Sequence, residues 1–354
     1  MLIYRRYATL SLMALVLCLC VLFGFSFLAQ ADDPPEKKPM QIITAFTTLP
    51  VENAAVISDE YEAATRIRVN FVPLSSEELI NRLAAQSQIE YGAAGKAAVV
   101  LADQATLRKA AERGYLTPYI SEAEDAVPDK LKQVDGLWTG VWYDPIVFCA
   151  NRTYVQNSVN LPRGWTELAT NPRCRVGVTD FLAADASANL FTSMVGAFGE
   201  DTTYDIWRQI HPRVKQYARY LSGPVRQAGM GETDISVAVQ SEALRYINDG
   251  YPLQIIYPEE GTAYYLIGEG VVRGIAAGDA ATAGAFADWL LSDDAQLALQ
   301  KHDFFFVPTN PATLTYKTFA GKNMFLFEDY YEFESTYKHR LLDRWVKEIR
   351  LGGY

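Results

Sequence analysis

The stretch "RIRVNFVPLSSEELINRLAAQ" (residues 66–86) decides the fold class, because a strand pattern runs directly into a helix pattern. Residues 66–74 have the apolar, β-branched composition of a strand. Ser75 and Glu78 then form the Ser-x-x-Glu capping box that is typical of a helix start. Three apolar residues share one face of the helix that follows: Leu79, Ile80 and Leu83. The stretch therefore predicts a strand followed at once by a helix.

The same alternation extends to both sides of this stretch. Residues 40–46 predict a buried strand, residues 47–65 a helix, and residues 97–103 a further short apolar strand. Strands that alternate with helices predict a parallel sheet with helices on its faces, and ligands bind such sheets outside the carboxyl ends of the strands. Polar residues at these strand ends are expected along one rim: Thr47, Thr48, Ser75, Ser76 and Asp103.

A second, similar series of elements begins near residue 136. Residues 174–180 predict a strand that ends at Asp180, and residues 186–199 predict a helix with Ser187 at its N-terminus. Residues 218–265 continue the series through a Ser-Gly-Pro turn, a helix, a strand and a second turn at 258–262. Later, Ser292 begins a helix whose first turn is acidic.

The first 31 residues have the pattern of a secretory signal peptide. Arg5 and Arg6 precede a long apolar run, which ends in Ala29-Gln30-Ala31, and cleavage is expected after Ala31. The alternative is a retained membrane anchor, because the apolar run is long enough to span a bilayer. Either way the remaining chain is expected to be exported, to the periplasm. Residues 32–40 are charged and proline-rich and are interpreted as a linker.

The remaining chain is acidic and long enough for two domains. Loss of Arg5 and Arg6, the charged residues among the first 31, changes the formal net charge from −10 to −12. This charge argues against nucleic acid or an anionic membrane as a partner and favours a soluble monomer. Two cysteines remain after cleavage, Cys149 and Cys174. They are expected either as a disulfide, worth on the order of 3 kcal/mol, or as two buried thiols on neighbouring strands.

Seven segments, taken in order, resemble bacterial extracellular solute-binding proteins of ABC transporters, in the group that binds ferric iron, phosphonates, phosphoglycerate and hexose phosphates. The segments are "GLWTGVWYDPIVFCAN" (136–151), "LPRGWTELATNPRCRVGVTD" (161–180), "FGED" (198–201), "GETDISVAV" (231–239), "YPEEGTAYY" (257–265), "FADWLLSDDAQ" (286–296) and "FVPTNPA" (306–312). The segment "FEDYYEFESTYKHRLLDRW" (327–345) resembles the terminal helix of the organophosphate-binding branch.

The resemblance implies a periplasmic binding protein-like II fold, with two α/β domains, each a mainly parallel sheet flanked by helices, and a ligand clamped between them. It places the first domain at residues 41–141 and 266–354 and the second at 142–265. It implies an ABC permease as partner, or a membrane sensor if the anchor is retained, and no cofactor. Trp142 and Tyr143 are expected to pack at the hinge, or to form an aromatic floor for a ligand.

The ligand implied by the polar corners is a small anionic organic solute, such as a phosphate ester or a phosphonate. Iron-binding relatives use a His or Glu after the first strand and two adjacent tyrosines after the Gly-Glu turn. This chain has "TTLPVE" (47–52) and "ISVAVQSEALRY" (235–246) there, and Tyr264-Tyr265 lies elsewhere. Ferric iron, which prefers anionic oxygen ligands, stays the alternative.

The expected ligand-binding residues supply hydroxyls, backbone N–H groups, one guanidinium and small turn residues. Ser75 and Ser187 are alternatively helix caps, Arg226 is alternatively a solvated arginine, and Asp180 is alternatively a turn residue. The set is Thr47, Thr48, Ser75, Ser76, Asp103, Asp180, Ser187, Ser222, Gly223, Arg226, Tyr257, Gly261 and Thr262.

An enzyme is not expected from this sequence. GxSxG and HExxH motifs do not occur, and no nucleophile motif accompanies the three histidines, His211, His302 and His339. The opposed corners of Ser222-Gly223 and Gly261-Thr262 on one side, and of Thr47-Thr48 and Ser75-Ser76 on the other, are instead expected to close on the ligand by a hinge motion.

Overall fold

The computed structural model describes residues 41–320, 324–328 and 335–352, and residues 41–354 form one compact unit. The predicted signal segment, its cleavage site and the linker lie outside the described residues. The strands are β1 (Gln41–Thr47), β2 (Ile67–Pro73), β3 (Ala97–Asp103), β4 (Leu116–Thr117), β5 (Thr139–Asn151), β6 (Val176–Val178), β7 (Ile235–Val239), β8 (Leu253–Ile256), β9 (Tyr264–Val272) and β10 (Val307–Pro308).

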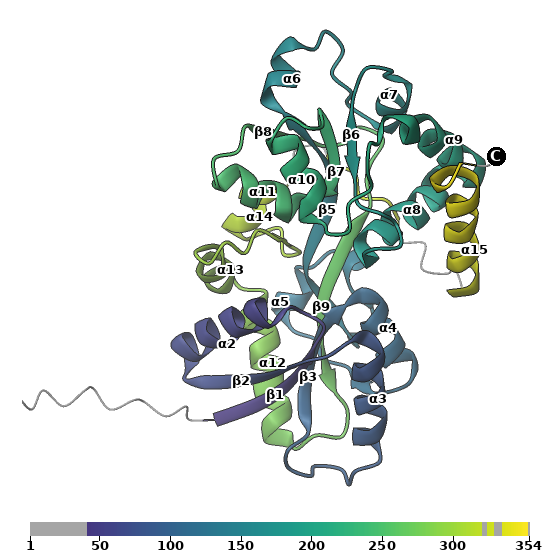
Figure 1. Ribbon diagram of the computed structural model, residues 1–354. Coiled ribbons are helices and arrows are strands. Elements are labelled where there is room, and N and C mark those ends of the chain that lie inside the picture. Colours follow the sequence, from purple (N-terminus) through teal and green to yellow (C-terminus); the bar gives the residue numbers. More distant parts are fainter. Residues whose placement is uncertain (1–40, 321–323, 329–334, 353–354) are drawn as a thin grey trace, which may run out of the picture. The chain divides into compact units, whose positions relative to one another are not determined.

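The helices follow these strands through most of the chain (Figure 1). They are α2 (Val51–Thr65), α3 (Ser76–Ser87), α4 (Gln104–Glu112), α5 (Glu122–Asp125), α6 (Arg152–Asn157), α7 (Trp165–Thr170), α8 (Asp185–Phe198), α9 (Glu200–Ile210), α10 (Ser222–Gly229), α11 (Gln240–Asn248), α12 (Ala277–Leu290), α13 (Asp293–Gln300), α14 (Leu314–Phe319) and α15 (Ser335–Trp345). Short helical turns occur at Asp129–Leu131 and His211–Arg213, and a π-helical turn, Val346–Arg350, continues α15.

The strands form one curled sheet in the order β2-β1-β3-β9-β5-β7-β6. β1 pairs in parallel with β2 and β3, and β6 pairs in parallel with β7, as the strand–helix alternation predicted. β9 and β5 run antiparallel to their neighbours and to each other. The predicted α/β class is therefore confirmed, with two long antiparallel strands in its centre.

β5 connects two hydrophobic cores. Val141, Trp142 and Tyr143 lie in the first core with residues of β1, β3 and β9, whereas Ile146 and Phe148 lie in the second core with residues of β6 and β7. Trp142 is fully buried, and its Nε1 donates a hydrogen bond to the Gln296 side chain at 2.8 Å. It is therefore a packing residue at the crossing, one of the two roles expected for it.

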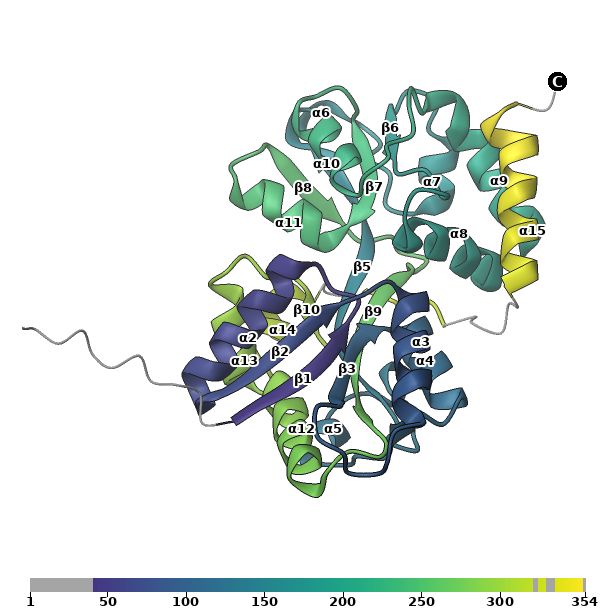
Figure 2. The same cartoon turned by 60° about the horizontal axis from the view of Figure 1, so that its bottom comes forward.

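The end of the chain packs against the second core. Leu341, Trp345 and Ile349 are buried there, and Figures 1 and 2 both show α15 beside α8 and α9. Arg344 forms an ion pair with Glu200, which fixes the same helix. The assignment of all residues from 266 to 354 to the first domain therefore differs from this packing, because the apolar face of α15 covers the second core.

Candidate functional site

One hollow, which we call the cleft pocket, has a volume of about 690 Å³. It lies between α3 and α4, which pack on the first core, and α8, β9 and α15. Its polar and aromatic lining includes Ser76, Glu77, Asp103, Gln104, Arg108, Lys109, Arg113, Asp185, Asn189, Tyr264, Tyr265, Lys338 and His339. The pocket is thus built by segments that are far apart in the sequence.

Three helices begin at the cleft pocket. The first residues of α3, α4 and α8 all line it. Ser75 caps α3 by accepting a hydrogen bond from the Glu78 amide at 3.2 Å, and Asp103 caps α4 from the Thr106 amide at 3.0 Å. α8 begins after Ala184, which has no side chain that could cap it. Amide groups at helix starts, with the helix dipole, form favourable sites for anions.

Gln104 gives the pocket a donor without a partner. Its Nε2 is buried and has no hydrogen-bond partner among the residues that the structure describes. Leaving a buried donor unsatisfied costs free energy, and a ligand oxygen recovers it only when the side chain turns its Nε2 into the pocket. The sequence reasoning did not find this residue, because a glutamine in the first turn of a helix carries no signal of its exposure or pairing.

The charges around the cleft pocket are mixed but lean basic. α4 contributes Arg108 and Lys109, the residue after it is Arg113, and α15 contributes Lys338. Three carboxylates lie at the helix starts: Glu77, Asp103 and Asp185. The Asp103 carboxylate already accepts hydrogen bonds within the protein, because the hydroxyls of Ser76 and Thr106 donate to its Oδ2 at 3.3 and 2.7 Å. An anionic ligand therefore meets basic side chains on α4 and α15 and helix amides beneath them.

Tyr264 and Tyr265 also line the cleft pocket. Burial, reinforced by Asp103 and Asp185, raises the pKa of Tyr265 well above its ordinary value, so its phenol is held neutral. The Tyr264 carbonyl accepts a hydrogen bond from Asn189 at 2.8 Å, which ties α8 to β9. The sequence analysis expected this pair to lie outside the place that iron-binding relatives use.

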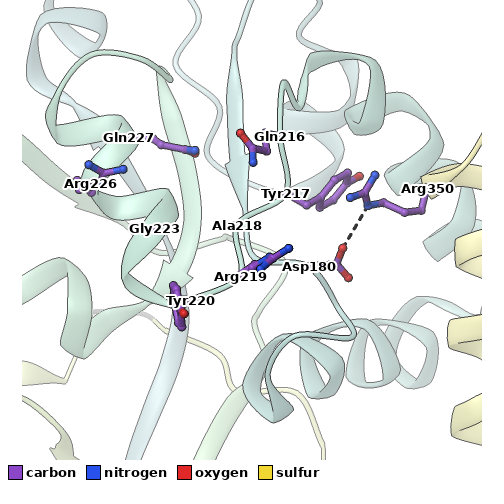
Figure 3. Close-up of a pocket in the computed structure, with 10 residues that line it drawn as sticks. All are labelled: Asp180, Gln216, Tyr217, Ala218, Arg219, Tyr220, Gly223, Arg226, Gln227 and Arg350. Carbon is purple, nitrogen blue, oxygen red and sulfur yellow. Dashed lines mark hydrogen bonds and ion pairs between the residues drawn. The ribbon is translucent and has the colours of Figure 1, made fainter.

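The second hollow, which we call the arginine pocket, has a volume of about 540 Å³ and is shown in Figure 3. It contains three of the expected ligand-binding residues, Asp180, Gly223 and Arg226, together with Arg219 and Arg350. Asp180 is paired with Arg350, whose Nε lies 3.2 Å from Oδ2 of the carboxylate.

Of the thirteen expected residues, Ser76 and Asp103 line the cleft pocket, and three line the arginine pocket. The other eight line neither hollow. Several of these hydroxyls hold the fold instead. Thr47 Oγ1 donates to the Leu101 carbonyl at 2.7 Å, Thr48 Oγ1 accepts from the Asp103 amide at 3.1 Å, and Ser187 Oγ donates to the Asp180 carbonyl at 2.9 Å. The residues of this group are Thr47, Thr48, Ser75, Ser187, Ser222, Tyr257, Gly261 and Thr262.

The Gly261-Thr262 corner is covered by another segment. Thr262 is fully buried; its Oγ1 donates to the Ile146 carbonyl at 2.6 Å, and its backbone pairs with Phe325 and Phe327. Gly261 has φ +106°, and a Cβ there would lie 2.9 Å from the Phe327 ring. Position 261 therefore requires glycine, because its φ is positive and because a side chain there would collide with the Phe327 ring. The four corners that were expected to face one another do not form one pocket.

The expected disulfide is not formed. Cys149 and Cys174 are free, buried thiols. Successive residues of a strand point to opposite faces, so Cys149 packs with Val147 against α10, while Cys174 packs with Phe148 and Ala150 in the second core. The alternative is correct in that both thiols are buried, but they do not lie on neighbouring strands, because Cys174 precedes β6 and β7 lies between β5 and β6. Burial raises the pKa of the Cys149 thiol to about 12.

The three histidines are separated in the structure. His211 Nδ1 lies 3.0 Å from the Tyr217 hydroxyl, His302 Nε2 lies 2.7 Å from Glu60 Oε1, and His339 lines the cleft pocket. Within the described ranges, no three His, Cys, Asp or Glu side chains are grouped as a metal site requires. Among the same residues, no helix is both long and apolar enough to cross a bilayer.

Comparison with known proteins adds a family and a fold. A family model described as bacterial extracellular solute-binding protein matches residues 95–329. An uncharacterized protein of Haemophilus influenzae is 27% identical over 261 residues, which are 69% of this chain and 73% of that protein.

Two solved structures illustrate the similarity of fold. The periplasmic binding protein AfuA of Actinobacillus pleuropneumoniae, with fructose 6-phosphate bound, has a TM-score of 0.65 and 21% identity over 88% of this chain and 99% of that one. A Bordetella ferric binding protein has a TM-score of 0.69 and 17% identity over 86% of this chain and 98% of that one.

Proposed function

The chain belongs to the bacterial extracellular solute-binding protein family, and we propose that it is the substrate-binding component of an ABC importer that captures a small anionic organic solute. The observation that carries this proposal is the meeting of three helix starts at the cleft pocket, one of them without a side-chain cap. Such starts offer amide donors and a positive dipole end to an anion.

A phosphate ester or a phosphonate suits the cleft pocket better than ferric iron. The unpartnered Gln104 amide and the basic residues of α4 and α15 are donors, which match the acceptor oxygens of a phosphoryl group. Ferric iron requires anionic oxygen ligands, and within the described residues no three His, Cys, Asp or Glu side chains are grouped as a metal site requires. AfuA, a relative in fold, was solved with fructose 6-phosphate, which is the same chemical class.

Capture is proposed to proceed by closure about β5 and β9. The cleft pocket has walls from elements of the first core, α3 and α4, and from α8 and α15, which pack on the second. A ligand that contacts both walls stabilises the closed arrangement by the contacts that exist only there. The two long strands, which are paired through Thr139 to Pro145, are the natural hinge.

A thermal-shift screen tests the proposed solute class. Each sugar phosphate or phosphonate is paired with its uncharged counterpart, and ferric citrate forms a separate arm. A solute at a thousand times its dissociation constant stabilises the folded state by about 4 kcal/mol, so the melting temperature should rise only with the charged member of a pair. Stabilisation by ferric citrate, or by the uncharged sugars equally, would contradict the proposal.

The proposed location is the periplasm, with an ABC permease as partner and no catalytic turnover. A sensing role, in which the same complex is presented to a membrane receptor, stays the second candidate because residues 8–28 are apolar enough to act as an anchor. The mass of the mature N-terminus in the native host distinguishes a released protein from an anchored one.

A further inference from the structure

Three acidic side chains lie together at the first core, outside both hollows. Glu124 is in α5, Glu269 is in the middle of β9, and Asp288 is in α12. Glu269 is 1% exposed and Glu124 is 4% exposed. In the sheet, Glu269 lies opposite Leu101 of β3 and Thr139 of β5. Carboxyl groups are rarely buried without a positive partner, so this group requires an explanation.

The three carboxyl groups are close enough to interact. The Glu124 carboxyl group lies within hydrogen-bonding reach of the side chains of Glu269 and Thr139. Oδ2 of Asp288 accepts a hydrogen bond from the Tyr119 hydroxyl at 2.8 Å. Oε2 of Glu269 and Oδ1 of Asp288 are buried and have no hydrogen-bond partner in the described part of the chain. The group therefore contains more acceptor oxygens than the surrounding protein supplies donors.

Positive charge is scarce around these groups. Lys132 is the cation that faces Glu124, and its Nζ donates to the Glu124 carbonyl at 2.8 Å and lies 4.0 Å from the exposed Asp129 carboxylate. The groups that act on Glu269 are Glu124 and Asp288, which are both acidic. Two carboxylates in contact in a protein interior repel each other too strongly for both to be ionised, so they retain a proton between them.

The direction of the pKa shifts agrees with this geometry. Burial, reinforced by Glu124 and Asp288, raises the pKa of Glu269 well above its ordinary value, and burial also raises the pKa of Glu124. Burial and the Asp288 carboxylate raise the pKa of Tyr119, so its phenol stays a hydrogen-bond donor. The proton between the two glutamates titrates as a property of the pair.

The segment that carries Glu124, which we call the acidic strap, comprises residues 119–132. Val127 and Leu131 of the strap are buried in the first core. Its polar side-chain contacts tie it to two elements, because Glu124 reaches β9 and Tyr119 reaches α12. Loss of the contact between Glu124 and β9 would leave the centre of the strap with fewer attachments to the sheet.

We infer that one proton held between Glu124 and Glu269 fastens the acidic strap to β9, and that the strap loosens when this proton is released to solvent at higher pH. The proton joins the two side chains as a carboxyl group that donates to a carboxylate. Without it, two like charges face each other in the interior. The inference goes beyond the proposed function, because these residues line neither the cleft pocket nor the arginine pocket.

The pH dependence follows from the raised pKa of the pair. Above about pH 4.5, the ordinary pKa of a glutamate, the unfolded chain has released the proton that the folded pair still holds. The pair therefore favours folding at low pH, and this contribution is lost as the pH rises toward the folded pKa. Asp144 titrates in an overlapping range, so the test uses Asp144→Asn as its background.

Hydrogen exchange of the strap amides between pH 5 and pH 8 tests the inference. The protein with Asp144→Asn alone is compared with Asp144→Asn/Glu269→Gln and with Asp144→Asn/Glu122→Gln, where Glu122 is an exposed residue of the same helix. After correction for the intrinsic rates, protection of residues 119–132 should fall by about tenfold or more in the background protein and in the Glu122 variant. It should stay nearly constant with Glu269→Gln, because the new amide donates to Glu124 at every pH.

Infrared spectroscopy of the same proteins observes the proton directly. At pH 6 the Asp144→Asn protein should show the C=O band of a protonated carboxylic acid, and Glu269→Gln should remove it. Glu124→Gln, which replaces the other member of the pair, should give the same two results if Glu269→Gln does not fold. Absence of the band in the Asp144→Asn protein, or an equal loss of strap protection with and without the Gln substitution, would overturn the inference. Neither result bears on solute binding in the cleft pocket.

Discussion

Asp144 allows a quantitative test of the hinge region through pH. It is fully buried on β5, and its carboxylate accepts hydrogen bonds from the Ser241 backbone amide and hydroxyl at the start of α11. Burial raises the pKa of Asp144 from 3.8 to about 7, and the Ser241 hydrogen bonds oppose the shift only in part. The folded protein therefore binds a proton at Asp144 that the unfolded chain has already released.

The sign and size of the effect follow from this difference in proton binding. A carboxyl group with a raised folded pKa is favourable to folding below its unfolded pKa, and this contribution is lost as the pH rises toward the folded pKa. Each pH unit between the two pKa values costs about 1.4 kcal/mol. Between pH 5 and pH 7, Asp144 should lower the free energy of unfolding by about 2–3 kcal/mol.

The variant Asp144→Asn removes the titration and keeps the size of the side chain. Its amide oxygen still accepts from the Ser241 N–H group, and the Ser241 hydroxyl accepts from its NH2 group. Urea unfolding at pH 5, 6, 7 and 8 should show a smaller fall in stability for the variant than for the wild-type protein. Asp249→Asn, at an exposed aspartate, is the control and should follow the wild-type curve. Parallel curves for the wild type and Asp144→Asn would refute the reasoning.

Three further predictions follow from the structure. Gly261→Ala should cost about 1–3 kcal/mol of stability, because φ is +106° and the new methyl group meets the Phe327 ring, and should leave solute affinity unchanged; thermal melting and titration check both. Unfolded but unreduced protein should show alkylation of both Cys149 and Cys174, and a cross-linked peptide would contradict the free thiols. The mature protein should begin after Ala31, and an intact mass that includes the first 31 residues would argue for a retained anchor.

The elements of the fold were predictable because their signals are local. The capping residues Ser75 and Ser292 are followed by helices in the structure, and both accept hydrogen bonds from backbone amides three residues later. The strands at β1, β2 and β3 were found from short apolar runs alone. Such patterns are formed by residues that are close together in the chain, so they can be recognised from the sequence without knowledge of the tertiary structure.

The site was less predictable because its geometry is not local. Thr262 looked like an open corner, but residues 325–327, which lie far along the chain, cover it. No sequence pattern marks Gln104. Its side-chain amide is buried and unpaired because of residues that pack around α4 in the folded structure. The Ser121 hydroxyl accepts a hydrogen bond from the Glu124 amide at 3.2 Å and caps α5. A hydroxyl at a turn or helix start can bind a ligand or can form a hydrogen bond within the fold, and the sequence alone does not distinguish the two roles.

The measurement that tests the central claim most directly is the affinity of the solute found in the thermal-shift screen for the variant Gln104→Met. Loss of a hydrogen bond to a charged ligand costs roughly 1.5–3 kcal/mol, so titration calorimetry should show binding that is about ten- to a hundredfold weaker. The free energy of unfolding should stay equal or rise, since an unpaired buried donor is removed. Gln254→Met, at an exposed position on β8, should bind as the wild type. Wild-type affinity in Gln104→Met would contradict the placement of the solute in the cleft pocket.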